Sequence, residues 1–192
     1  MTCIVVLVSN DGTVVMGSDS GGFSDDSKEI RVEPKVFQVG QIVFGFCGNF
    51  RIGQLLQYGL SDACEKLQVI FDDEHFFKHL ILEFVPKLQK LMKKHGCVKN
   101  DDGLKTMDAE IVMGLHGRAF KIEGNFQISE IKYFDAIGSG SASALGALNM
   151  LYVYGSNDYC GGLTAYDAAM RALETAKKMS PFVAEPFKIL EI

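Results

Sequence analysis

The chain opens with MTCIVVLVSNDGTVVMGSDS (residues 1–20), the stretch that decides the fold. Residues 4–8 are apolar and mostly β-branched, a composition typical of a β-strand. The sequence Asn10-Asp11-Gly12 is a strong hairpin signal, and a second apolar run follows it. The stretch therefore predicts an N-terminal β-hairpin with strands at residues 2–9 and 13–19.

Thr2 lies directly before the first predicted strand, one processing step from becoming the N-terminal residue. A threonine hydroxyl is a poor nucleophile at neutral pH, but a free α-amino group beside it, with a pKa of roughly 8, can accept its proton. Removal of Met1 would supply the nucleophile and the base together. The alternative is an ordinary strand threonine whose initiator methionine is routinely trimmed.

The composition favours a single domain spanning residues 1–192. Apolar residues make up 47% of the chain, enough for a substantial core, and no Pro-rich, Ser-rich or charge-rich segment interrupts it. The formal net charge of -5 and the lack of a Lys/Arg stripe argue against nucleic acid as a partner. No apolar run approaches the roughly 20 residues that span a bilayer, and the start lacks a signal-peptide pattern. We therefore expect a cytoplasmic protein without a membrane partner, and the five scattered cysteines predict reduced thiols.

The hydrophobic pattern predicts strands, two helices, strands, two helices and a final strand. Acidic residues at 72–74 and Gly96 match the two ends of the second helix. Two packed sheets, each covered by helices on its outer face, satisfy this order, so we expect an α+β fold that is a four-layer αββα sandwich. Beyond the N-terminal hairpin and a polar loop after it, the expected strands are residues 35–39, 42–47, 108–116, 118–123, 126–137 and 187–192, and the expected helices are about residues 50–70, 73–95, 141–154 and 163–179.

Four further residues stand at predicted strand ends, where they could meet Thr2. Asp19 ends the second strand and Lys35 begins the third, although each alone is ordinarily a solvated surface residue. Gly48 ends the buried strand IVFGFCG (residues 42–48), where a bare backbone N–H could reach a developing oxyanion. Ser139 lies in AIGSGS (residues 136–141), another junction between a strand and a helix.

Two other sites are compatible with parts of the sequence. The glycine-rich junction at residues 138–141 could cradle a phosphate, but neither a dinucleotide-binding pattern nor a Walker lysine follows it. His75, His79 and Glu83 recur at helical spacing and could bind zinc. Phenylalanines and leucines form an apolar face on the same helix, so this row is better explained as its solvated side. We therefore expect neither a metal nor another cofactor.

Five segments together resemble proteasome β-type subunits and the bacterial HslV peptidase, within the N-terminal nucleophile (Ntn) hydrolase superfamily. They occur in family order and at family-like spacing over nearly the whole chain. The segments are MTCIVV (residues 1–6), VMGSDS (15–20), KVF (35–37), FGFCG (44–48) and AIGSG (136–140).

This resemblance implies a threonine-type endopeptidase in which Thr2, once it is the N-terminal residue, attacks the scissile carbonyl while its own amine shuttles the proton. Lys35 would stabilise the negative oxygen and keep the amine neutral, and Asp19 would hold Lys35 in place. The Gly48 amide would stabilise the oxyanion, and Ser139 would hydrogen-bond the threonine amine and its water. Substitution of either member of the ion pair by alanine is expected to abolish turnover.

Some positions depart from the family pattern. The Asp-x-x-Ser pair that braces the N-terminus of proteasome β subunits is not evident in residues 177–183. Lys177 replaces a glycine in the segment where HslV binds sodium, so no metal is carried over. Cys3 replaces the more familiar second threonine, and Phe46 is placed to line or occlude the S1 pocket, which would favour small substrate side chains.

The resemblance further implies homo-oligomeric rings, hexameric or heptameric and stacked, that cleave unfolded polypeptides or peptides delivered by an AAA+ ATPase unfoldase. Two alternatives stay open: a proteasome-like ring scaffold without catalytic activity, and an Ntn amidase that acts on a small amide. The presence of Thr2, Asp19 and Lys35 together argues against the scaffold. The oligomeric state would help to separate the two hydrolases, because an amidase need not enclose its site.

Overall fold

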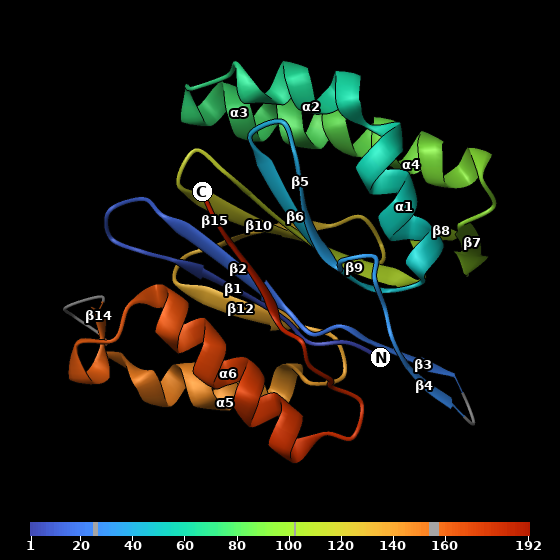
Figure 1. Ribbon diagram of the computed structural model, residues 1–192. Helices are drawn as coiled ribbons and strands as arrows, with labels where there is room; N and C mark the ends of the chain where they lie inside the picture. The colour runs from blue at the N-terminus through green and yellow to red at the C-terminus, as the bar shows by residue number, and fades with distance from the viewer. Residues whose placement is uncertain (25–26, 102, 154–157) are drawn as a thin grey trace.

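The computed structural model describes residues 1–24, 27–101, 103–153 and 158–192. These residues form four layers, in which two sheets pack face to face and helices cover both outer faces (Figure 1). Helices α1 to α4 lie over one sheet, the upper sheet in Figure 1, and α5 and α6 lie under the other. The expected α+β class and αββα sandwich are confirmed. Within the described ranges, no helix is long and apolar enough to cross a membrane.

The lower sheet is built around the predicted N-terminal hairpin. The turn between its strands contains Gly12 at φ +83°, a conformation that glycine adopts without steric cost. All pairings in this sheet are antiparallel. Its strand order is β12 (Phe134–Ile137), β1 (Ile4–Val8), β2 (Val14–Ser18) and β15 (Lys188–Glu191).

The upper sheet is also antiparallel, and short hairpins flank the two main sheets. Its strand order is β11 (Ile128–Ile131), β10 (Arg118–Ile122), β9 (Ala109–Leu115), β6 (Ile42–Gly48) and β5 (Val36–Val39). The separate pairs are β3 (Gly21–Ser24) with β4 (Ser27–Ile30), β7 (Val98–Asp101) with β8 (Leu104–Met107), and β13 (Tyr152–Val153) with β14 (Asp158–Tyr159).

The helices divide between the two outer layers. Asp72 accepts a hydrogen bond from the His75 backbone N–H and caps α3, as the acidic start of the predicted helix indicates. The upper layer holds α1 (Phe50–Gly59), α2 (Ser61–Gln68), α3 (Asp73–His79), a π-helical turn (Leu80–Phe84) and α4 (Val85–Lys94); the lower layer holds α5 (Ser141–Leu151) and α6 (Ala165–Met179), and a short 3-10 turn (Cys160–Gly162) lies between them in the chain.

Strand β1 shows why the sheets pack on both faces. Its side chains alternate, so Ile4 and Val6 enter the core between the sheets while Val5 and Leu7 pack on the lower helices. Both faces are therefore buried, which explains the continuous apolar run. A Cβ added at Gly45 of β6 would lie 2.8 Å from the Ile4 side chain, so this glycine lets the two sheets approach closely.

Several predicted boundaries are wrong, and each has a physical reason. The helix expected at residues 50–70 breaks at Leu60, whose φ of -122° is not helical. The helix expected at 73–95 contains a π-helical turn that ends at Phe84, two residues before Pro86, which lacks the N–H that a regular helix needs. The strand expected at 126–137 is two strands in different sheets, β11 and β12.

The short hairpins were the other error, because residues 20–34 were expected to form only a loop. Strand β4 is exposed along its length, so its side chains carry no alternating burial signal.

The predicted helix at 141–154 ends at Leu151, and its last expected residue lies outside the described residues. The five cysteines are free, and three of them are buried (Cys3, Cys47 and Cys64).

Candidate active site

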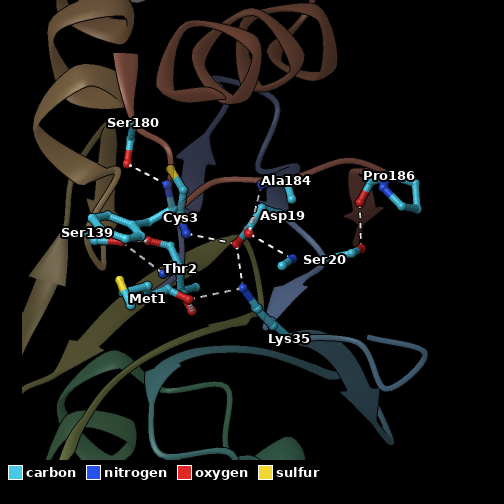
Figure 2. Close-up of polar contacts among 12 residues, drawn as sticks. Met1, Thr2, Cys3, Asp19, Ser20, Lys35, Ser139, Ser180, Ala184 and Pro186 are labelled. Atoms are coloured by element: carbon cyan, nitrogen blue, oxygen red, sulfur yellow. Dashed lines mark hydrogen bonds and ion pairs between the residues drawn. The ribbon is translucent and has the colours of Figure 1, made fainter. Parts of the chain in front are cut away.

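The chain segments before β1, after β2 and after β12 meet at one end of the lower sheet. Ile4, the first residue of β1, pairs with Ser18 at the end of β2 and with Ile137 at the end of β12. Strand β1 lies between the other two, so the residues just beyond these ends are neighbours. Thr2 and Asp19 are brought together in this way, as Figure 2 shows.

Lys35 comes from the other sheet, directly before β5, and its side chain reaches Asp19 (Figure 2). Lys35 Nζ lies 2.7 Å from Asp19 Oδ1, and the two side chains are 1% and 0% exposed. Burial lowers the pKa of the Lys35 ammonium, while the charge and hydrogen bond of Asp19 oppose that shift. The structure thus joins these two predicted residues as a buried ion pair.

Within the described residues, the Asp19 carboxylate accepts four hydrogen bonds. Its Oδ1 accepts from Lys35 Nζ and from the Cys3 backbone N–H at 2.9 Å. Its Oδ2 accepts from the backbone N–H groups of Gly21 at 2.9 Å and Ala184 at 3.2 Å. A carboxylate has about four lone-pair sites, so this set uses its capacity and fixes its orientation.

Thr2 is 2% exposed and is held by both backbone and side chain. Its backbone nitrogen donates to Ser139 Oγ at 3.0 Å, and its carbonyl accepts from the Gly140 N–H at 3.1 Å. Its hydroxyl donates to the Met1 carbonyl oxygen at 2.6 Å, and Lys35 Nζ lies 3.4 Å from that same oxygen. The Thr2 hydroxyl and the Lys35 ammonium therefore converge on one peptide carbonyl.

Gly48 ends β6 and is not among the hydrogen-bonding members of this cluster in the described part of the chain. Its φ of +97° and the closeness of the Asp108 carbonyl oxygen, with which any Cβ would collide, both require glycine. Gly138 connects it to the site: a Cβ there would collide with the Thr2 carbonyl and lie 3.3 Å from the Cβ of Cys47, the residue before Gly48.

Two buried thiols, of Cys3 and Cys47, are poor nucleophiles beside the Thr2 hydroxyl. Burial raises the pKa of Cys3 to about 12, and the negative charge of Asp19 adds to this. Burial also raises the pKa of Cys47 to about 12. Since the thiolate is the nucleophilic form of cysteine, both side chains are chemically quiet at neutral pH.

Sequence reasoning missed the three backbone donors to Asp19, which are Cys3, Gly21 and Ala184. Gly21 follows Asp19 by two residues, a spacing at which aspartate often accepts from the backbone, so this donor had a local signal. Ala184 is 165 residues away from Asp19 and had none. The missing Asp-x-x-Ser brace leaves Ser180 in a local role, because its Oγ accepts from the Phe182 N–H at 3.2 Å.

The two alternative sites that the sequence raised, a phosphate cradle and a zinc site, are not supported by the described residues. At the glycine-rich junction, the Gly140 N–H donates to Thr2 and the Ser141 N–H donates to the Gly138 carbonyl, so these donors are used inside the chain. His75 pairs with Asp72 at 2.6 Å on an exposed surface. No group of three His, Cys, Asp or Glu side chains that could hold a metal ion is found within the described ranges.

Phe46 is buried and packs edge-on against Phe50, with ring centroids 5.8 Å apart. Its ring lies directly over Gly53, where any Cβ would collide with it. A cavity of about 250 Å³ lies beside these residues, with Glu33 on its wall. Lys35 Nζ is 5.9 Å from the Phe50 ring, which places this cavity close to the ion pair.

The same arrangement of elements occurs in solved structures. BPH from Thiobacillus denitrificans superposes with a TM-score of 0.77 over 100% of this chain and 97% of its own, at 18% identity. The same protein in complex with epoxomicin gives 0.76 over 100% and 98%, also at 18% identity. Eukaryotic HslV from Trypanosoma brucei gives 0.66 over 99% and 98%, at 20% identity.

The fold is the Ntn-hydrolase fold of HslV. At these identities the likeness defines the fold and leaves the chemistry to be argued from this chain's own residues. Neither a protein-family model nor a curated protein sequence matches the chain. Within the Ntn-hydrolase fold described here, Thr2, Asp19, Lys35 and Ser139 form one hydrogen-bonded cluster.

Proposed function

We propose that this chain is a threonine-type endopeptidase whose nucleophile is the hydroxyl of Thr2 after removal of Met1. One observation carries the proposal. The Thr2 hydroxyl donates a hydrogen bond to the Met1 carbonyl oxygen, and the buried Lys35 ammonium lies 3.4 Å from that same oxygen. With Met1 attached, the Thr2 nitrogen is an amide and cannot accept a proton. Release of Met1 would turn the Thr2 nitrogen into a free amine, next to the hydroxyl that this amine must deprotonate.

The proposed roles follow from the contacts of each side chain. The Lys35 ammonium would stabilise the developing alkoxide and disfavour a second positive charge on the amine. Asp19 acts through Lys35 as a positioning residue, since its carboxylate holds the ammonium at 2.7 Å. Ser139 would orient the amine, because its Oγ already accepts from the Thr2 nitrogen.

The oxyanion would be stabilised by the backbone N–H of Gly48, which ends β6 directly after Cys47. The cavity next to Phe46 is the proposed S1 pocket. Because the Phe46 ring fills the space over Gly53, we expect this pocket to take small substrate side chains.

The proposal extends to assembly by analogy with the fold alone. We propose a homo-oligomeric ring, hexameric or heptameric and stacked, that cleaves unfolded polypeptides delivered by an AAA+ ATPase in the cytoplasm. A closed ring would keep folded proteins away from the nucleophile, which a small, exposed amidase site would not need.

The test is the intact mass of the purified protein before and after treatment with a peptidyl epoxyketone. This reagent forms a ring with a threonine that has both a free amine and a free hydroxyl. Loss of Met1 and one adduct per chain, absent in Thr2→Ala, is the expected result. A chain that keeps Met1 and gains no adduct would instead be an inactive scaffold. Digestion of unfolded casein by protein that was not treated with the epoxyketone then separates a peptidase from an amidase.

A further inference from the structure

The outer face of the upper helix layer carries a long groove. Two cavities, of about 510 and 380 Å³, lie where α1 and α2 pack on α4. Tyr58, Gly59 and Leu91 line both, so the cavities are two ends of one depression, here called the α4 groove. A Cβ added at Gly59 would lie 2.7 Å from the Leu91 side chain, which shows how closely α1 approaches α4 at the middle of the groove.

The larger end of the α4 groove is positively charged. Lys66 of α2 and Lys87, Lys90 and Lys94 of α4 line it, and the last three recur at the spacing of one helix face. Among the ion pairs of the described residues, none involves any of these four lysines. Asp62 is the acidic residue on the same wall. The local charge is thus opposite to the formal net charge of -5 of the whole chain.

The start of α2 lies at the same end of the groove, directly after the end of α1 at Leu60. Ser61 and Asp62, its first residues, line the same end of the groove, and Leu60 before them provides no side-chain cap. Because the end of α1 meets the start of α2 here, the partial charges of the two helix ends offset each other, and the lysines supply the positive charge. The four lysines therefore point to an anionic group at this end.

The smaller end of the groove is more apolar. Leu55, Tyr58 and Leu91 line it together with Arg51, Gln54 and His95. Tyr58 is 78% exposed, so its ring is available to pack against a ligand. A ligand that fills the whole groove must combine carboxylates with an apolar side chain.

We propose that the α4 groove binds an acidic peptide segment of a partner protein. Its carboxylates would lie on Lys66, Lys90 and Lys94, and an apolar side chain would pack between Tyr58 and Leu91. A nucleic acid fits less well, because the lysines are confined to one cavity and the net charge of the chain repels a long polyanion. The groove is formed by the outer helices, so this binding does not depend on the proposed peptidase activity.

The test is the fluorescence anisotropy of a labelled peptide of five Glu-Leu repeats titrated with the full chain carrying Thr2→Ala, which prevents cleavage of the probe. We expect saturable binding that weakens with salt, and a loss of affinity of about tenfold or more in Lys90→Glu/Lys94→Glu. Asp62→Asn removes the one acidic side chain of that wall and should tighten binding severalfold, a gain that misfolding cannot produce.

The matched control is Lys93→Glu/Lys99→Glu, which changes the net charge equally at exposed positions outside the groove. Unchanged affinity in this control supports the proposal. An equal loss in both double variants would overturn it, since the effect would then be one of net charge. Binding of an oligothymidylate as tightly as the peptide, with the same dependence on Lys90 and Lys94, would also overturn it in favour of nucleic acid.

Discussion

Asp19→Asn should destabilise the protein strongly, although the two side chains are almost the same size. The substitution leaves the Lys35 ammonium buried without a counter-charge, since the two side chains are 1% and 0% exposed. It also replaces one carboxylate oxygen by an NH₂ group. That group cannot accept the hydrogen bonds that the backbone N–H groups of Cys3, Gly21 or Ala184 donate to Asp19. Breaking a buried pair by removing one partner lowers the free energy of unfolding by about 3–5 kcal/mol. The loss is a large share of the roughly 5–15 kcal/mol that stabilises a typical domain.

The assay is urea unfolding followed by circular dichroism, at one fixed protein concentration because assembly would shift the midpoint. Asp135→Asn is the matched control: it breaks a Lys121–Asp135 pair of the same 2.7 Å length whose side chains are 23% and 19% exposed. A partly solvated pair contributes about 1 kcal/mol or less. Equal losses in both variants would refute the reasoning. So would a double variant, Asp19→Asn/Lys35→Met, that is no more stable than Asp19→Asn, because removing the unpaired charge should restore stability.

Three further outcomes are expected. Gly48→Ala places a Cβ at φ +97° against the Asp108 carbonyl oxygen. It should lower the free energy of unfolding by about 2 kcal/mol more than Gly96→Ala, whose Cβ would meet nothing within 4 Å. Thermal melts of the two variants would check this, and equal shifts in melting temperature would contradict it. Ser139→Ala should reduce kcat on a peptide substrate about a hundredfold while shifting stability by only about 1 kcal/mol, and an unchanged kcat would remove its proposed role. Burial lowers the folded-state pKa of Lys35 below 10.5, so the unfolded chain binds more protons between the two values and stability should rise with pH through that window. Urea midpoints of Lys35→Met should lack this rise, and an identical slope in both proteins would show that another group causes it.

Much of the fold was accessible from the sequence because the main sheets and helices carry strong local signals. The apolar run of β1, the turn at Gly12 and the acidic start of α3 each report on their own neighbourhood. The short hairpins carried no such signal, since β4 is exposed and buries no alternating side chains. The division of residues 126–137 into β11 and β12 was also hidden, because a change of sheet is decided by distant partners.

The sequence by itself determined that Thr2, Asp19, Lys35 and Ser139 stand at the ends of elements, since the boundaries of strands follow from side-chain periodicity and turn residues. Only the tertiary structure decided that these ends meet. The register of β1 against β2 and β12 brings Asp19 to Thr2, and the packing of two sheets brings Lys35 to both. The Ala184 donor, 165 residues from Asp19, belongs to the same class. A buried ion pair forms only when the whole core excludes water from it, and local sequence does not encode that exclusion.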